Sequence, residues 1–229
     1  MIGTIVNTIT VLIGSTLGTI IGDRLPERIH TKVMEGIGLV TILIGIKMSL
    51  EVKYILVVIG AITTGAAIGE AIGIEAYLER FADRLKKRFA REDKKDFVTG
   101  FVTSTLLFTV GPMTILGCIQ DGLYGNHELL FAKSMLDGIS SLALASAMGI
   151  GVVFSAPAVL VIQGLLTELS SVFIFLTKSP FLQDFTSVGG LIIIALGLRL
   201  LRIRDLKPGN FLPALVVVVF FDWIAILIP

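Results

Sequence analysis

Residues 97–119 read FVTGFVTSTLLFTVGPMTILGCI, and this stretch is the most informative part of the chain. It is long and apolar enough to cross the roughly 30 Å hydrocarbon core of a bilayer as a helix, which takes about 20 residues. Gly111 and Pro112 interrupt it, and proline removes a backbone donor and clashes with the preceding helical turn. The stretch therefore predicts a membrane-spanning helix that is broken within the bilayer.

Seven further apolar stretches flank this one, and each is near the length of a spanning helix. They cover residues 3–22, 33–50, 53–73, 134–153, 155–176, 187–203 and 211–228. The composition is 54% hydrophobic and 16% charged, with a mean hydropathy of +0.91, so a soluble globule of this sequence would expose large apolar patches. We predict an all-α polytopic transmembrane bundle of about eight spans with broken central helices, forming one integral domain over residues 1–229.

The basic residues predict the orientation of this bundle, because Lys and Arg near helix ends are retained on the cytoplasmic side. Of the 19 Lys and Arg residues, 15 fall in or at the edge of the connections after the first, third and seventh stretches. The four on the other side are Lys47, Lys53, Lys133 and Lys178. We therefore expect a multi-pass protein whose termini are both external.

The connection over residues 74–96 predicts an amphipathic helix. Apolar side chains recur there at helical spacing while Arg and Lys fill the other face; they are Ile74, Tyr77, Leu78, Phe81, Leu85 and Phe89. Such a helix lies on the inner leaflet with membrane lipid as its partner. A solvated cytoplasmic helix packed on the bundle is the alternative. The formal net charge of +1 does not indicate a surface that binds nucleic acid.

An internal echo links the two ends of the chain. The pattern of Gly38-Leu39 and Gly45–Met48 recurs in Gly190-Leu191 and Gly197–Leu200 with a constant offset of 152. If the unit 1–73 corresponds to 155–229, the number of intervening spans makes the two units an inverted repeat, an arrangement common in secondary transporters. Coincidence is the alternative, because Gly and Leu are frequent in any transmembrane chain.

Two glycine zippers predict close helix packing, since small residues let membrane helices approach each other. They comprise Gly14, Gly18 and Gly22, and Gly65, Gly69 and Gly73. We expect one zipper to pack against the other within a protomer. An interface between subunits of a homo-oligomer is the alternative.

Polar side chains concentrate in the two central stretches, 97–119 and 134–153, next to two predicted breaks. Unwound backbone at this depth is tolerated where it lines a polar cavity, and half-helix ends there hold ions or solutes. The alternative is a kink whose hydroxyls bond their own helix carbonyls. The candidate substrate-binding or ion-binding residues are Asn7, Thr103, Ser104, Thr105, Gly111, Pro112, Gln120, Asp121, Asp137, Ser140, Ser141 and Gln163.

Two of these candidates, Asp121 and Asp137, flank the expected external loop 122–132. They lie either in interfacial water or at the mouth of a site. A buried carboxylate is costly unless it is paired, and Lys133 is the nearest cation in the sequence.

Motifs for catalysis or metal binding are absent from the sequence. It has no HExxH, CxxC, Walker or GxSxG pattern, and His30 and His127 fall on opposite faces of the expected topology. We therefore expect no enzyme, no metal and no cofactor. The single cysteine, Cys118, cannot form an internal disulfide and is expected to be buried.

Several blocks together resemble the YdfK/YqgA family of uncharacterised prokaryotic membrane proteins, a family built on a domain of unknown function. The blocks are Asn7 with Gly14–Gly22, Arg24–Arg28, Gly38–Lys47, Gly111–Gly117, Asp121-Gly122 and Lys133–Gly138. The resemblance covers essentially the whole chain. It implies a small polytopic protein of the cytoplasmic (inner) membrane of a prokaryote, and it implies no substrate.

The leading functional hypothesis is a secondary transporter or permease for a small solute, in which a monovalent cation is a candidate coupling ion. A passive ion channel is the alternative within transport. From a different class comes a non-transporting membrane scaffold or sensor assembled through its glycine zippers.

Overall fold

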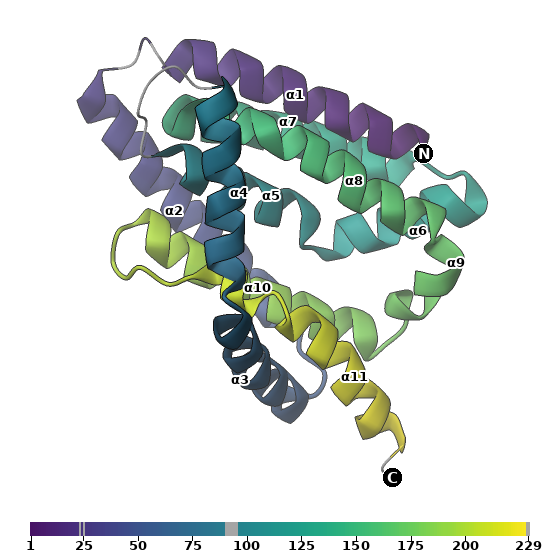
Figure 1. Cartoon of the computed structure of the whole chain (residues 1–229). Coiled ribbons are helices and arrows are strands. Elements are labelled where there is room, and N and C mark those ends of the chain that lie inside the picture. Colours follow the sequence, from purple (N-terminus) through teal and green to yellow (C-terminus); the bar gives the residue numbers. More distant parts are fainter. Residues whose placement is uncertain (23, 25, 90–95, 228–229) are drawn as a thin grey trace. The chain divides into compact units, whose positions relative to one another are not determined.

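The computed structural model describes residues 1–22, 24, 26–89 and 96–227, apart from the side chains at 27, 30, 82, 85–89 and 96. The described residues form helices joined by short turns, with no strand among them (Figure 1). The predicted all-helical class is confirmed.

The helices gather into two compact units, each built from both halves of the chain. Unit 1 comprises Met1–Ile37 and Glu79–Ile174, and unit 2 comprises Gly38–Leu78 and Phe175–Pro229. Among the described elements, α2 (Glu27–Ser49), α4 (Ile74–Phe89) and the short η2 (Ile174–Thr177) contribute residues to both units.

In unit 1, α1 (Ile2–Gly22) and α7 (Glu128–Met148) run parallel with their backbones in close approach (Figure 1). A Cβ at Gly14, Gly18 or Gly22 would overlap a carbonyl oxygen of α7. The oxygens in question belong to Gly138, Leu142 and Ser146, in the same order along the chain. Because a side chain would fill this space, the glycines allow the two helices to touch.

The next helix, α8 (Ser155–Glu168), runs back along α1. The 3₁₀ segment η1 (Gly149–Phe154) begins where α7 ends, and Gly149 has a left-handed φ of 72° that favours glycine. At the far end of α8, the Thr167 hydroxyl lies 3.2 Å from that of Thr4 near the start of α1. The chain therefore reverses at residues 149–154, where the sequence predicts a break.

The predicted break at Gly111 is confirmed: α5 (Asp96–Thr109) and α6 (Pro112–Tyr124) meet there with a bend of 59°. The start of α5 lies beside η1, because a Cβ on Gly151 would overlap the Phe97 carbonyl oxygen. The end of α6 lies beside the end of α8, where Gly122 meets the Thr167 carbonyl oxygen in the same way. The bent pair thus crosses unit 1 from end to end, and the short α9 (Ser170–Phe173) and η2 (Ile174–Thr177) follow α8.

Unit 2 contains α3 (Ile55–Ile72), α10 (Phe181–Leu200), η3 (Pro208–Phe211) and α11 (Ala214–Leu227), with the Gly38–Ser49 part of α2. Two antiparallel contacts hold the long helices together. Along α3, Gly65 faces Ala214 and Gly69 faces Asn210 at backbone distance, so α11 runs against it.

The second antiparallel contact joins α2 to α10 through the glycines of the internal echo. A Cβ on Gly45 would lie 2.7 Å from the Gly190 carbonyl oxygen, and a Cβ on Gly190 would lie 2.6 Å from that of Gly45. Further along, a Cβ on Gly197 would lie 3.0 Å from the Gly38 carbonyl oxygen. Each glycine of the pattern in α2 therefore faces a glycine of the pattern in α10.

These contacts correct the expected pairing of the two glycine zippers. The glycines of the first zipper, Gly14, Gly18 and Gly22, pack against α7 of their own unit. Gly65 packs against the start of α11, and Gly69 packs against Asn210 in η3. Gly73 is different again, since it ends α3 with a left-handed φ of 74° and nothing lies within 4 Å of its Cβ position. The sequence identified the packing residues, but the partner that it assigned to them is wrong.

A buried carboxylate, that of Glu75 in the first turn of α4, fixes the junction between α3 and α4 to α10 and η3. It pairs with the Arg199 guanidinium and accepts a hydrogen bond from the Gly209 backbone N–H at 2.6 Å. The Asn210 side chain accepts from the Glu75 N–H at 2.7 Å and donates to Glu70 at 2.6 Å. Arg199 and the hydrogen bonds compensate the buried charge of Glu75. Removing one of these partners would leave the charge uncompensated and would destabilise the packing of these elements.

Length and composition identify five described helical stretches as candidate spans, or six if α5 and α6 count together as one. The prediction of about eight spans is not confirmed. One of the five candidates is the 41-residue stretch Glu128–Glu168, which reverses at η1 as described above.

In α4, the Phe81 ring contacts that of Phe101 on α5 at 5.9 Å between centroids, while Tyr77 and Phe81 are 59% and 50% exposed. The predicted docking of α4 on lipid stays a prediction. The side chains of Leu85 and Phe89 and all of residues 90–95 lie outside the described part.

Candidate functional site

A buried ion pair lies in the first half of α7, within unit 1. On α7, Lys133 Nζ donates to Asp137 Oδ2 at 2.6 Å, and the two side chains are 8% and 9% exposed. The spacing of four residues places both on one face of the helix. Since α7 begins at Glu128 rather than near residue 134, Asp137 lies well inside the helix and not at its surface end.

The neighbouring helix α1 completes the surroundings of this carboxylate. Asn7, fully buried, donates from Nδ2 to Asp137 Oδ2 at 3.0 Å. Its own amide oxygen, Oδ1, is buried with no hydrogen-bond donor beside it in the described part of the chain. The side chain therefore uses one end to hold Asp137 and leaves a free acceptor at the other.

Gln163 on α8 lies at the same level. The contact between Thr4 and Thr167 sets the register of the antiparallel pair, and Asn7 and Gln163 each lie one turn further toward the middle. Gln163 is fully buried, and among the described residues neither its amide oxygen nor its amide nitrogen has a partner. A buried polar group left without a partner costs about 1–3 kcal/mol, so this side chain is an unusual feature for a packed interior.

The break between α5 and α6 lies between two ends that are fixed within unit 1, because α5 starts next to η1 and α6 ends next to Thr167. Across the break, the Thr114 hydroxyl donates to the Phe108 carbonyl oxygen at 3.2 Å. On α5, the hydroxyls of Thr103 and Thr105 are buried without a partner among the described residues. The broken helix thus adds further unsatisfied polar groups to unit 1.

Together these side chains form a polar centre, which consists of Asn7, Lys133, Asp137 and Gln163. Three helices supply it, and it combines a positive group, a negative group, a free amide oxygen and a complete free amide. Donors and acceptors arranged in this way fit the hydrogen-bonding groups of a small polar molecule.

Of the residues predicted from the sequence, Asn7 and Asp137 are joined by a hydrogen bond, and the register of α1 against α8 places Gln163 at the level of Asn7. Two others act within their own helices: the Ser104 hydroxyl donates to the Gly100 carbonyl at 2.7 Å, and that of Ser141 to the Gly138 carbonyl at 2.8 Å. For these two serines the alternative of a hydroxyl bonded to its own helix is the observed one. The remaining α7 candidate, Ser140, is half-buried.

Asp121 lies outside the polar centre, at the start of α1. Its carboxylate accepts from the Gly3 N–H at 3.0 Å and from the Met1 amine at 3.0 Å, and His127 Nδ1 lies 2.6 Å away. A carboxylate at a helix N-terminus satisfies otherwise unpaired N–H groups there. The neighbouring Gln120 is half-buried, and its carbonyl accepts from the Asn126 N–H in the following turn.

Sequence reasoning left Lys133 out of the candidate residues and named it only as a nearby cation. The sequence did contain a signal for the ion pair. If the helix is predicted to begin at Glu128, Lys133 lies one helical turn before Asp137. The pair Thr4 and Thr167 had no such signal, since their contact joins residues 163 positions apart.

Comparisons with known proteins place this arrangement in a family. The model of a family described as "Protein of unknown function (DUF554)" matches residues 2–223. The uncharacterized protein YqgA of Escherichia coli (strain K12) is 31% identical over 219 residues, which cover 94% of this chain and 93% of that protein. The uncharacterized membrane protein YdfK of Bacillus subtilis (strain 168) is 30% identical over 221 residues, covering 95% and 93%. No solved structure matches the chain significantly.

Proposed function

The chain belongs to the DUF554 family of proteins of unknown function, and we propose that it is a secondary transporter or permease for a small polar solute. The observation that carries the proposal is the fully buried Gln163, whose amide has no partner in the described part of the chain. A purely structural core has no use for such a group, whereas a binding site needs one.

The charges of the polar centre narrow the class of solute. Lys133 and Asp137 neutralise each other within one salt bridge. A cargo with a single net charge would enter this buried region without compensation, which is costly away from water. We therefore propose a cargo that is neutral or zwitterionic and that carries several hydrogen-bonding groups.

The second support for transport is the contact between α2 and α10. A two-fold rotation that exchanges Gly38 with Gly190 also exchanges Gly45 with Gly197 at the offset of the internal echo. This rotation turns the observed contact between Gly38 and Gly197 into the observed contact between Gly190 and Gly45. Such self-complementary contact is what inverted repeats make across their axis, and inverted repeats supply the two access states of many carriers.

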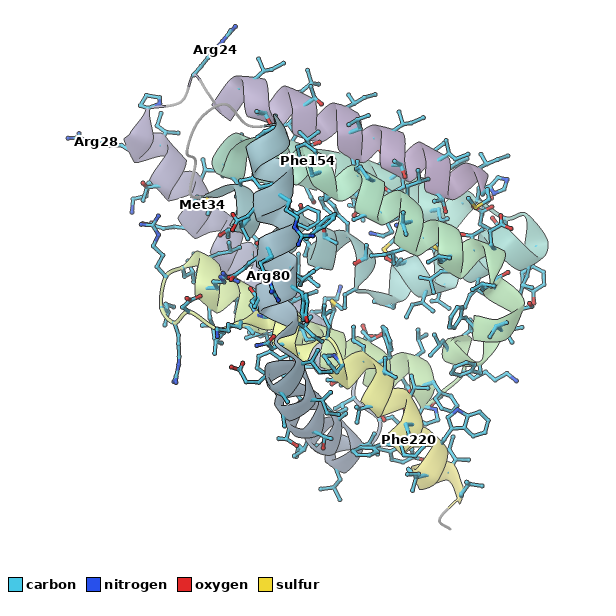
Figure 2. The ribbon with its side chains drawn as sticks, in the orientation of Figure 1. Arg24, Arg28, Met34, Arg80, Phe154 and Phe220 are labelled. Carbon is cyan, nitrogen blue, oxygen red and sulfur yellow. The ribbon has the colours of Figure 1, made fainter. Side chains whose placement is uncertain are left out.

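The proposal includes a location and an orientation. The apolar helices and the membrane-protein relative support a membrane protein. We place it in the cytoplasmic membrane with both termini external, because the basic residues gather in three connections. Figure 2 shows Arg24 and Arg28 projecting outward at the turn between α1 and α2, which suits contact with headgroups or water.

Uptake into proteoliposomes tests the proposal. The purified protein is reconstituted and supplied with a radiolabelled pool of amino acids and small neutral polar solutes. Saturable uptake that Gln163→Leu abolishes is the expected result. The matched control is Gln183→Leu on α10. The Gln183 amide oxygen accepts a hydrogen bond from the exposed Ser179 hydroxyl, and the Gln183→Leu variant should transport normally.

The alternatives give different results in the same assay. A passive channel gives flux that does not saturate with solute concentration. A scaffold or sensor gives no uptake for any variant. Assembly through the zippers is the less favoured proposal, because their glycines already contact helices of the same chain; these are Gly14, Gly18, Gly22, Gly65 and Gly69. Equal uptake by wild type and Gln163→Leu would remove the polar centre as the site.

A further inference from the structure

Unit 2 contains two buried carboxylates that face each other, those of Asp184 on α10 and Asp222 on α11. Both residues are fully buried. The helices that carry them pack together through the rings of Phe181 and Trp223, next to the two acids, and Asp184 is the charged neighbour of Asp222. The pair lies outside the polar centre, which belongs to unit 1.

The two carboxylates differ in their hydrogen bonds. Asp184 accepts three bonds from the backbone at the start of α3, from the Lys53 N–H at 2.6 Å and from the Tyr54 N–H at 3.1 Å to each of its oxygens. Asp222 has no donor beside either oxygen among the described residues. Donors aimed at a carboxylate favour its ionised form, and burial without donors favours the protonated form.

Two neighbouring negative charges cannot both persist in a buried site, so the pair must bind a cation. A metal ion of the size of sodium needs several oxygen ligands, and both oxygens of Asp184 already accept backbone N–H bonds. A proton fits, since it occupies the hydrogen bond itself. It would be covalently bound to Asp222 and donated to an oxygen of Asp184, and the pair would keep one negative charge.

The surroundings close the pair off from water. Phe181 and Trp223 pack with ring centroids 5.7 Å apart, one turn before Asp184 and one residue after Asp222. Phe175 packs against Phe181 at 5.4 Å. Phe220, labelled on α11 in Figure 2, is 62% exposed, and a residue two positions further along a helix points to nearly the opposite side. Asp222 therefore faces the interior of unit 2.

We propose that Asp184 and Asp222 form a proton-binding site in which Asp222 carries one exchangeable proton and Asp184 accepts its hydrogen bond. The groups that face this site are the backbone N–H groups of Lys53 and Tyr54 from the start of α3, Asp184 from α10 and Asp222 from α11. Release of the proton requires that the two carboxylates separate, so the proton state is linked to the packing of α10 against α11. Its use as the coupling ion of uptake rests on the proposed transport function.

Infrared spectroscopy of the purified protein tests the site without any transport. At neutral pH, the wild type should show a protonated-carboxyl band that shifts in heavy water. Asp222→Asn should remove this band and still fold, because the new amide can donate to Asp184 as the acid did. The matched control is Glu51→Gln, an exposed acid close in sequence to Lys53, which should leave the band unchanged.

Two results would overturn the proposal. One is a wild-type spectrum without the band, or a band that survives in Asp222→Asn. The other is a thermal midpoint of unfolding that sodium chloride raises and choline chloride does not. If this effect is seen in the wild type and not in Asp222→Asn, the site binds sodium. Failure of uptake in proteoliposomes would overturn the transport proposal while leaving the band in place, so the two failures are distinguishable.

If uptake is found, a pH gradient should accelerate it several-fold in the wild type and in Glu51→Gln. In Asp222→Asn, the gradient should have no effect on uptake while solute exchange at equal pH continues. Gradient-driven uptake that persists in this variant would refute the coupling role.

Discussion

Asn7 and Asp137, which are 130 positions apart in the sequence, are joined by a hydrogen bond of 3.0 Å from Nδ2 to Oδ2. The same carboxylate oxygen accepts from Lys133 Nζ, so two donors from two helices meet on one atom. The position of the carboxylate is therefore fixed by its neighbours. The same hydrogen bond holds the Asn7 side chain, with its free amide oxygen, in a defined geometry.

The ion pair of the polar centre should show strong energetic coupling. Lys133→Met leaves Asp137 buried without its cation and should lower the free energy of unfolding by about 3–5 kcal/mol. Adding Asp137→Asn should recover most of this loss, because the uncompensated charge is gone. Denaturation of the purified variants in detergent provides the measurement, and additive effects of the two substitutions would contradict the ion pair.

Gln163 should be unfavourable for stability. Replacing a buried amide that has no partner with an apolar side chain of similar size removes an unsatisfied group, so Gln163→Leu should stabilise the fold by about 1–3 kcal/mol. The thermal midpoint of unfolding measures this change, and Gln183→Leu on α10 should be neutral within about 0.5 kcal/mol. A clear loss of stability in Gln163→Leu would mean that the amide has a structural role.

The contact between α1 and α7 should depend on glycine. A Cβ at Gly18 would overlap the Leu142 carbonyl oxygen, so Gly18→Ala should destabilise the protein by about 1–3 kcal/mol. Gly36 on α2 has nothing within 4 Å of its Cβ position, so Gly36→Ala should be neutral or stabilise by up to about 1 kcal/mol through helix propensity. Equal midpoints of unfolding for the two variants would contradict the close approach.

The proposed orientation can be tested with a membrane-impermeant thiol reagent. In a Cys118→Ala background, Asn126→Cys lies in the exposed turn after α6, and Asp205→Cys lies in the basic connection after α10. The reagent should label the first in intact cells and the second only after the membrane is opened. Labelling of the Asp205→Cys variant in intact cells would reverse the orientation.

Much of the helix content could be predicted, because it follows from local patterns. The break at Gly111 and Pro112 has a purely local cause, and so does the reversal near Gly149. The small residues that allow close packing were also visible. Their partners were not, since nothing in the sequence near Gly18 indicates that it meets Leu142 rather than another helix.

The site was predicted in part for the same reason. Asn7, Asp137 and Gln163 stand out as polar residues in apolar stretches, so their inclusion needed no tertiary information. Their meeting depends on the parallel course of α1 and α7 and on the return of α8, which the sequence did not specify. The pairing of Asp184 with Asp222 needed the same long-range information, and a single acid near a helix end gives no sign that it faces another.

The glycine contact between α2 and α10 has an evolutionary consequence. Two identical segments inserted into a bilayer in opposite directions would make this contact with no change of residue, since rotation about its axis exchanges equivalent glycines. If the proposed inverted repeat arose by gene duplication and fusion, a shorter ancestral polypeptide with mixed insertion had this contact before the two copies were joined. In that case, relatives in which only one of the two glycine pairs has diverged would record how far the fused halves have since specialised.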